Sequence, residues 1–297
     1  MASEKYLQDM KAQKFGIEIE FSFITRYMAK EAICRELNSQ DMIDAKGRKW
    51  KIVNDISIVP KRRTEDGSVV GADSYYSVEL NSPILEYDDL DLLGGVLKAL
   101  RDAGAEPSEV CGIHIHVSED GHTVRSLRNL INMFMQKEDI MKEAFQIDDT
   151  RQEIYCQNVN KDLVSKINRH KARTLNELFD QWNEEYCGRY RMLNIESLYN
   201  RLGIEFRLFN STLNMEVVRA YIVFCLAVSQ KAKTMQRSVP IKSKMDNNRY
   251  GWRNFLNRLG LAGDEFKEVR RRLLMHVSGD AAFHSPEKYG RRRIIKH

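Results

Sequence analysis

The chain has 297 residues, of which 42% are hydrophobic and 30% charged, and this composition excludes an intrinsically disordered chain. The N-terminal residues lack the apolar core of a signal peptide, and the longest apolar run, Ala220 to Val228, is too short to span a bilayer. The five cysteines are widely spaced, which argues against a disulfide framework or a cysteine zinc site. We therefore expect a cytoplasmic globular protein that does not bind membranes.

The predicted elements alternate between the strand and helix periods. In chain order they are a strand at 16–24, a helix at 27–37, strands at 50–59 and 74–80, a helix at 88–103, a strand at 112–118, helices at 123–145 and near 174–184, a strand at 203–209 and a helix at 215–235. The polar stretch 61–73 suits a long hairpin or loop. The alternation alone permits a parallel sheet, but the chain has no GxGxxG or Walker-type phosphate loop.

The end of the chain is basic. From Lys231 onward there are about 17 Lys and Arg against 6 Asp and Glu, although the whole chain carries only +5. Such a segment can bind nucleic acid, supply cations to nucleotide phosphates, or form a solvated helical face. Its arginine runs contain few aromatic residues, which argues against base stacking and therefore against a nucleic-acid partner.

Three of the predicted strands place two ionisable residues two positions apart, between β-branched or aromatic residues. These pairs are Glu18 with Glu20, His114 with His116, and Glu205 with Arg207. Because positions i and i+2 of a strand point to the same face, each pair predicts a polar face backed by an apolar one. Buried carboxylates are costly unless they are paired or bind a metal, so adjacent strands of this kind indicate a site.

The side chains of these pairs favour hard divalent cations. Carboxylates suit Mg²⁺ and Mn²⁺, histidines shift the preference toward Mn²⁺ or Zn²⁺, and an arginine beside them indicates an anion such as phosphate. Each pair alone has a plainer interpretation, a solvated face or a salt bridge, but the recurrence of the same flanks favours a joint site. Glu79, and Asp55 with Ser57, either extend the row or are ordinary strand-end residues.

An ordered set of motifs supports the same interpretation. The motifs are FGIEIEF at 15–21, ITR at 24–26, Trp50 with Asp55 and Ser57, ELNSPI at 79–84, CGIHIHV at 111–117, RY at 189–190 with LN at 193–194, and GIEFRLFNST at 203–212. The set resembles the amidoligases, a family of the glutamine synthetase-like carboxylate–amine ligase superfamily, over residues 14–230. The sequence departs from the family pattern at Ile204 and Ser211, neither of which replaces a charged residue.

The resemblance implies an α+β, glutamine synthetase-like catalytic fold, with a curved, mainly antiparallel sheet and helices on its outer face. It also implies an enzyme that uses ATP to convert a carboxylate into an acyl phosphate, which an amine attacks to form an amide. We expect residues 1–240 to form this catalytic domain and residues 241–297 a basic helical extension packed on or near it. The substrates are small-molecule or peptide carboxylates and amines; neither their identity nor the oligomeric state follows from the sequence.

The resemblance further implies residue roles. Two or three Mg²⁺ or Mn²⁺ ions would be bound by Glu18, Glu20, Glu79, His114 and Glu205. The remaining family-like positions are His116 near the ATP phosphates, Arg207 stabilising the transferring phosphoryl group, Asp55 as a further metal or substrate contact, and Arg26 and Arg189 as cofactor-binding residues.

Two other functions remain open at the level of the sequence. A metal-dependent hydrolase or phosphotransferase could use the same carboxylate and histidine face, since the His-x-His pair alone would suit zinc. A non-enzymatic nucleic-acid or protein-binding module would instead use the basic C-terminal segment.

Overall fold

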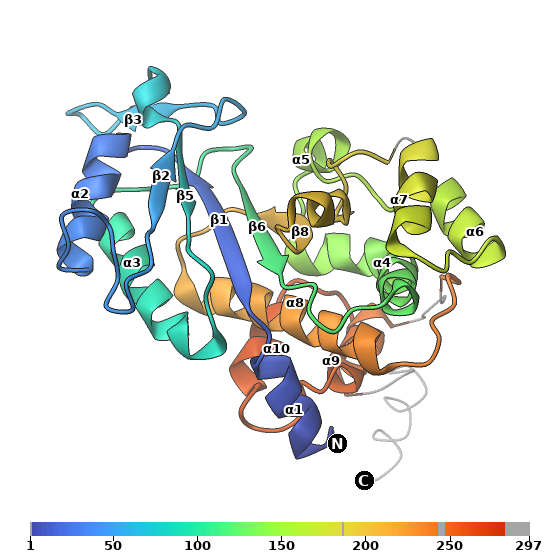
Figure 1. The fold of residues 1–297 in the computed structure, drawn as a ribbon. Helices are drawn as coiled ribbons and strands as arrows, with labels where there is room; N and C mark the ends of the chain where they lie inside the picture. Colours follow the sequence, from blue (N-terminus) through green and yellow to red (C-terminus); the bar gives the residue numbers. More distant parts are fainter. Residues whose placement is uncertain (1, 186, 243–246, 283–297) are drawn as a thin grey trace, which may run out of the picture.

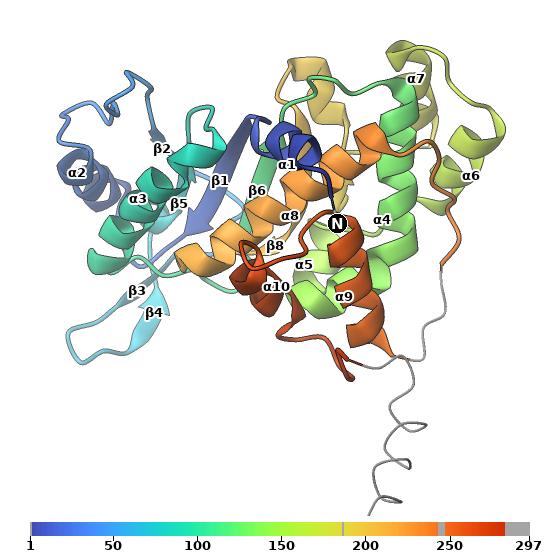
Figure 2. The ribbon, with the colours of Figure 1, turned by 90° about the horizontal axis from the view of Figure 1, so that it is seen from below.

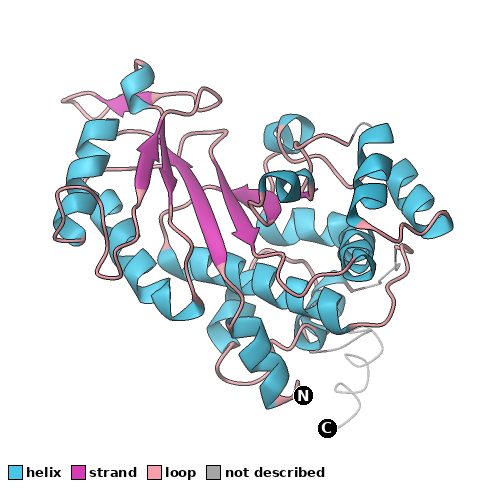
Figure 3. Cartoon of the chain, viewed as in Figure 1, coloured by secondary structure: helices cyan, strands magenta, loops and turns pink. Residues whose placement is uncertain are grey.

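The computed structural model describes residues 2–185, 187–242 and 247–282, and its main sheet has six strands in the order β2-β5-β1-β6-β8-β7 (Figures 1 and 3). The strands are β1 (Phe15–Phe21), β2 (Lys51–Val53), β5 (Val78–Asn81), β6 (Gly112–Val117), β7 (Leu193–Asn194) and β8 (Ile204–Asn210). Every neighbouring pair is antiparallel, which rules out the parallel arrangement that the alternation of elements allowed. The fold is therefore an open, antiparallel α+β structure, which agrees with the predicted fold class.

Helices cover one face of this sheet. The α-helices of the described residues are α1 (Glu4–Lys11), α2 (Arg26–Glu36), α3 (Leu90–Asp102), α4 (Val124–Phe145), α5 (Asp149–Ile154), α6 (Lys161–Arg169), α7 (Leu175–Glu184), α8 (Met215–Thr234), α9 (Asn248–Arg258) and α10 (Lys267–Leu274), and not all of them belong to this layer. Figure 2 shows α3 and α8 crossing beneath the strands, and α8 contacts β6 while α4 contacts β8. Among the described residues, none of the helices combines the length and the apolar character that crossing a membrane requires.

The covered face is apolar because of the period-two pattern. Ile17 and Ile19 of β1, Ile113 and Ile115 of β6 and Phe206 of β8 are at most 1% exposed. Full burial of side chains of this size stabilises a fold by about 1.5–3 kcal/mol each. The alternate residues of the same strands then lie on the opposite face of the sheet.

Three predicted strands are shorter than expected. The strand predicted at 16–24 ends at Phe21, because Phe23 has a φ of 71°, in the left-handed region that extended strands do not use. The strand predicted at 50–59 is reduced to β2, because the Asp55 side chain accepts a 2.7 Å hydrogen bond from the Ser57 amide and turns the chain.

The third of these strands, predicted at 74–80, begins only at Val78. A 3₁₀ turn occupies Ser74–Tyr76, and the Asp73 side chain caps it by accepting a 2.8 Å hydrogen bond from the Tyr75 amide. The polar stretch before it forms a small hairpin of β3 (Lys61–Arg63) and β4 (Val69–Gly71), one of the two forms that the sequence suggested.

Two helices beyond residue 240 pack on the core through Trp252 of α9. Its ring is fully buried, lies 5.8 Å from the ring of Phe224 in α8 and 6.1 Å from that of Phe145 in α4, and its Nε1 donates a 2.8 Å hydrogen bond to the carbonyl of Leu273 in α10. The domain boundary at residue 240 stays a prediction, and residues 243–246 and 283–297 of the proposed extension lie outside the described residues.

We expect Trp252→Ala to lower the free energy of unfolding by about 3–5 kcal/mol, because it empties this aromatic contact and leaves the Leu273 carbonyl without its donor. Chemical denaturation measures the change. The control is Tyr27→Ala, since Tyr27 is 71% exposed and its removal is expected to cost less than about 0.5 kcal/mol. A loss of equal size in both variants would contradict the anchoring role.

Candidate functional site

The open face of the sheet carries a row of ionisable side chains that the strand register brings together. The cross-strand neighbours are Glu20 with Glu79, Glu18 with His114, and His116 with Glu205. Directly opposed residues in antiparallel strands have Cβ atoms about 4.5–5.5 Å apart, so each pair is in side-chain contact range. The predicted pairs on β1, β6 and β8 therefore share one polar face, and β5 adds Glu79.

A first group of potential metal ligands consists of Glu18, His114 and Glu205. Nδ1 of His114 lies 3.1 Å from Oε2 of Glu18 and 3.8 Å from Oε1 of Glu205. One ligand atom from each residue lies within 4.8 Å of the others, and two of the three side chains are buried. Two carboxylates and an imidazole at this spacing can hold a divalent cation such as Mn²⁺ or Zn²⁺.

A second group consists of Glu20, Asp55 and Glu79, whose oxygens also lie within 4.8 Å of one another. The Gly112 amide donates a 2.6 Å hydrogen bond to Oε2 of Glu20, which fixes that carboxylate on the floor of the site. Asp55 reaches the group from the turn after β2. An all-oxygen set of this kind suits Mg²⁺ or Mn²⁺.

His114 lies between the two groups. While its Nδ1 faces Glu18, its Nε2 lies 3.7 Å from Oε1 of Glu20. The two ligand groups are therefore neighbours, and the face has the donor set for two adjacent cations.

Arg207 supplies the predicted positive charge. Its Nη1 forms an ion pair with Oε1 of Glu205, and the second oxygen of Glu205 accepts a 2.7 Å hydrogen bond from Nδ2 of Asn194. Arg207 is 9% exposed, and its buried Nε has no hydrogen-bond partner among the described residues. A buried N–H of this kind is costly, so an anion bound at the site would satisfy it.

The sequence did not single out Arg151, a second buried arginine of the site. It comes from α5, is 1% exposed, and donates 3.1 Å hydrogen bonds to the carbonyls of Val110 and Arg207. Its guanidinium occupies the space that a side chain at position 112 would need, because a Cβ on Gly112 would lie 2.0 Å from Nη1. In the sequence, Gly112 before the His-x-His pair is the feature that indicates that another group fills the space above the strand.

The carboxylates of the row differ in their pKa values. Burial alone would raise the pKa of Glu18, but hydrogen bonds with His114 and His116 outweigh it and hold the pKa well below its ordinary range. Burial, reinforced by the charges of Glu18 and Asp55, raises the pKa of Glu79 to about 8. Glu79 therefore retains a proton at neutral pH when no cation is present, whereas Glu18 is ionised.

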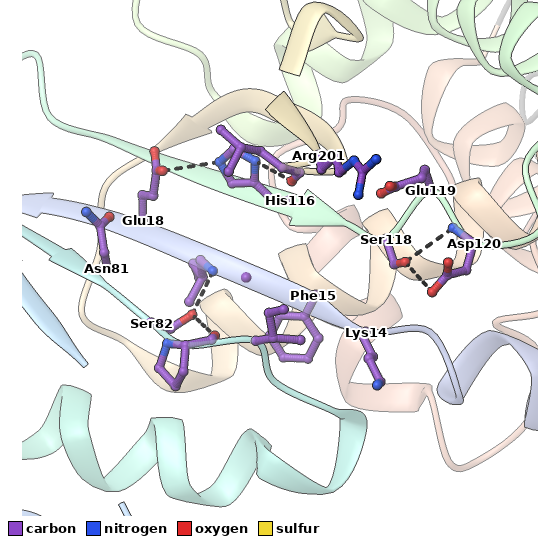
Figure 4. A pocket seen from close by; sticks show the side chains of 16 residues that line it. Lys14, Phe15, Glu18, Asn81, Ser82, His116, Ser118, Glu119, Asp120 and Arg201 are labelled. Atoms are coloured by element: carbon purple, nitrogen blue, oxygen red, sulfur yellow. Dashed lines mark hydrogen bonds and ion pairs between the residues drawn. The ribbon is translucent and has the colours of Figure 1, made fainter. Parts of the chain in front are cut away.

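A cavity of about 460 Å³ adjoins the row at its His116 end (Figure 4). Glu18 and His116 lie at one end of it, and Lys14, Glu119 and Asp120 lie at the other. Its lining also includes the apolar residues Phe15, Pro83 and Leu202 and the cation Arg201. Nδ1 of His116 lies 3.1 Å from the Leu202 carbonyl, which orients the imidazole at the boundary between the row and the cavity.

Arg26 and Arg189 are the two predicted residues that belong neither to the strand pairs nor to the two ligand groups of this row, although the charge of Arg189 interacts with Glu205 and Asp55. Arg26 donates to the Asn54 side chain at 2.9 Å and to the Ser77 carbonyl at 3.0 Å, so it joins the two loops around Asp55. Arg189 and Arg207 both approach the ring of Tyr190, with Cζ atoms 4.9 Å and 5.7 Å from its centre. Neither Arg26 nor Arg189 lines the 460 Å³ cavity, and their assignment to cofactor binding stays a prediction.

The chain belongs to the family described as "Putative amidoligase enzyme", which matches residues 11–229 and confirms the family indicated by the motifs. No curated protein matches the sequence. Among solved structures, the chain is similar to a bifunctional glutathione synthetase from Pasteurella multocida, with 11% identity and a TM-score of 0.42 over 99% of this chain. This chain spans half the length of that protein.

The pKa of Glu79 leads to a prediction about stability. A folded-state pKa of about 8, above the ordinary 4.5, contributes stability that is present below pH 4.5 and lost as the pH rises through 8. We expect the metal-free protein to lose stability relative to Glu79→Gln across this window, by at most about 1.4 kcal/mol per pH unit. Denaturation at several pH values measures the difference.

The control for this measurement is Glu31→Gln, which changes an exposed carboxylate of α2. The difference between wild type and this variant is expected to be independent of pH. If the free energies of unfolding of the wild type and of Glu79→Gln change in parallel from pH 5 to pH 8, Glu79 does not titrate within the window.

Proposed function

We propose that the protein is an ATP-dependent carboxylate–amine ligase that forms an amide through an acyl phosphate, on a variant of the glutamine synthetase-like fold. The observation that carries this proposal is the pair of adjoining ligand groups on one sheet face, beside Arg207 and next to a cavity of nucleotide size. Membership of the amidoligase family supports it. The wholly antiparallel sheet with helices on its other face agrees with the proposed fold.

The donors suit the divalent ions that such a reaction needs. Glu18, His114 and Glu205 would hold one ion, and Glu20, Asp55 and Glu79 a second. When bound, these ions neutralise the phosphate oxygens and align the transferring group. The fit is also electrostatic, because a cation at the second group would take the place of the proton that Glu79 retains at neutral pH.

The cavity suits the nucleotide. Its apolar residues Phe15, Pro83 and Leu202 offer a surface for a base. The cations Lys14 and Arg201 line it together with the carboxylates Glu18, Glu119 and Asp120, so bound metal ions would have to supply the remaining positive charge for the phosphates. A nucleotide bound there would direct its phosphates past His116 toward the ligand groups, because His116 lines the cavity and opposes Glu205 in the sheet. The reacting phosphate would then lie near Arg207.

The proposed reaction has two balanced steps. An oxygen of the substrate carboxylate attacks the γ-phosphorus, the bond to the β–γ bridging oxygen breaks, and ADP leaves. The amine nitrogen then attacks the acyl carbon, the carbon–oxygen bond to phosphate breaks, and the nitrogen loses a proton as the amide forms. Arg207 would stabilise charge on the phosphoryl group in both steps, since its buried Nε lacks a partner among the described residues.

Calorimetric titration with ATP in the presence of Mn²⁺ tests the nucleotide and metal face directly. We expect Glu18→Gln and Glu205→Gln to weaken metal-dependent ATP binding by at least about tenfold, because each removes a negatively charged ligand of the first group. The matched control is Glu138→Gln, which changes a carboxylate that is 1% exposed and lies in α4 outside the polar face. Thermal unfolding verifies that each variant is folded.

If both site variants bind ATP as tightly as the wild type, the polar face of the sheet is not the metal and nucleotide site. Tightly bound zinc without any ATP binding would instead favour a metal-dependent hydrolase or phosphotransferase, because His114 makes the first group suitable for zinc. A screen of carboxylates and amines then tests the reaction itself. ADP and phosphate release that requires both substrates supports the ligase, and release without any amide product contradicts it.

A further inference from the structure

A second cavity, of about 420 Å³, lies in the helical layer between α4, the C-terminal end of α8 and α9. Figure 2, which views the molecule from below, shows α4, α8 and α9 near one another. The cavity shares no lining residue with the 460 Å³ cavity or with either group of metal ligands. It is therefore separate from the site assigned to the ligase reaction.

The lining of this cavity combines apolar side chains with cations. Met133, Met235, Phe255 and Leu259 contribute the apolar surface. The basic residues that line it are Lys137 of α4, Lys231 of α8, Arg258 of α9 and Arg237 of the following loop. None of the lining residues is acidic, so the cavity has a single sign of charge.

Three of these cations, Lys231, Arg237 and Arg258, form no ion pair with a carboxylate of the described residues. Burial, together with the charge of Arg258, lowers the pKa of the Lys137 ammonium group, whose Nζ lies 5.6 Å from the centre of the Phe255 ring. Cations that repel one another around an apolar hollow create a positive potential that an anion would relieve.

A neighbouring hollow extends the same surface. It has a volume of about 580 Å³, shares Lys231, Asn254 and Arg258 with the first cavity, and reaches Ser3 and Tyr6 at the start of the chain. Lys231 and Arg258 therefore lie where the two hollows meet. These two cations are within reach of an anionic group bound in either hollow.

We propose that the 420 Å³ cavity binds a small organic anion, with its apolar body between the α4 and α9 side chains and its phosphate, sulfonate or carboxylate group at Lys231 and Arg258. The volume lies within the range of sites for small molecules, and a concave apolar cavity distinguishes it from the flat basic surfaces that bind nucleic acid. This role accounts for part of the basic C-terminal segment, whose described residues neither line the 460 Å³ cavity nor belong to the two ligand groups.

Fluorescence titration with anilinonaphthalene sulfonate, an aromatic anion, tests the proposal on the full chain. We expect one saturable site, and we expect Arg258→Glu and Lys231→Glu each to weaken binding by about tenfold or more, because each replaces an attraction by a repulsion. Arg258 is exposed, so its replacement leaves the core intact. The matched control is Lys30→Glu, which reverses an exposed charge on α2 and is expected to leave the affinity unchanged.

Competition separates this site from the proposed nucleotide site and from a nucleic-acid surface. Inorganic pyrophosphate is expected to displace the probe from the wild type, and binding of the probe is expected to persist in Glu18→Gln. Unchanged affinity in both charge-reversal variants would overturn the proposal. Displacement by short single-stranded DNA but not by pyrophosphate would also overturn it, since the surface would then bind a polyanion. Neither result depends on whether the protein is a ligase.

Discussion

Like charges on one sheet face repel one another, and the polar face of this sheet carries Glu18, Glu20, Glu79 and Glu205 beside the buried arginines Arg151 and Arg207. Arg207 forms an ion pair with Glu205, and the imidazoles of His114 and His116 lie 3.1 Å and 3.3 Å from the carboxylate oxygens of Glu18. In the second group, Glu20 faces His114 and the Gly112 amide, whereas Glu79 keeps a proton because burial and the neighbouring carboxylates raise its pKa. The carboxylates of the face therefore suit bound cations, whereas the unpartnered Nε of Arg207 suits an anion.

The polar face could be predicted because its information is local. A strand repeats every two residues, so the spacing of Glu18 and Glu20, of His114 and His116, and of Glu205 and Arg207 fixes which side chains share a face. The apolar residues between them fix which face is buried. Membership of the amidoligase family was also predictable, because the motifs combine order with spacing over most of the matched region.

The sequence did not predict features that depend on contacts between distant segments. Strand order and register arise from pairings such as Glu18 with His114, which no local pattern encodes. Arg151 enters the site from a six-residue helix whose own sequence has no strand-like or motif-like signal. The segment around Asp55 contains β-branched residues that favour a strand, but the hydrogen bond from the Ser57 amide to the Asp55 side chain turns the chain instead. Asp55 nevertheless belongs to the second ligand group.

The close contact between Gly112 and Arg151 constrains both positions. A side chain at position 112 would require the Arg151 guanidinium to move from its present place. Replacement of Arg151 by a smaller residue would leave an unfilled space above Gly112. It would also remove the donor that the carbonyls of Val110 and Arg207 now have. The two positions, 39 residues apart in the sequence, are therefore coupled, because the space that a side chain at position 112 would need is the space that the Arg151 guanidinium fills.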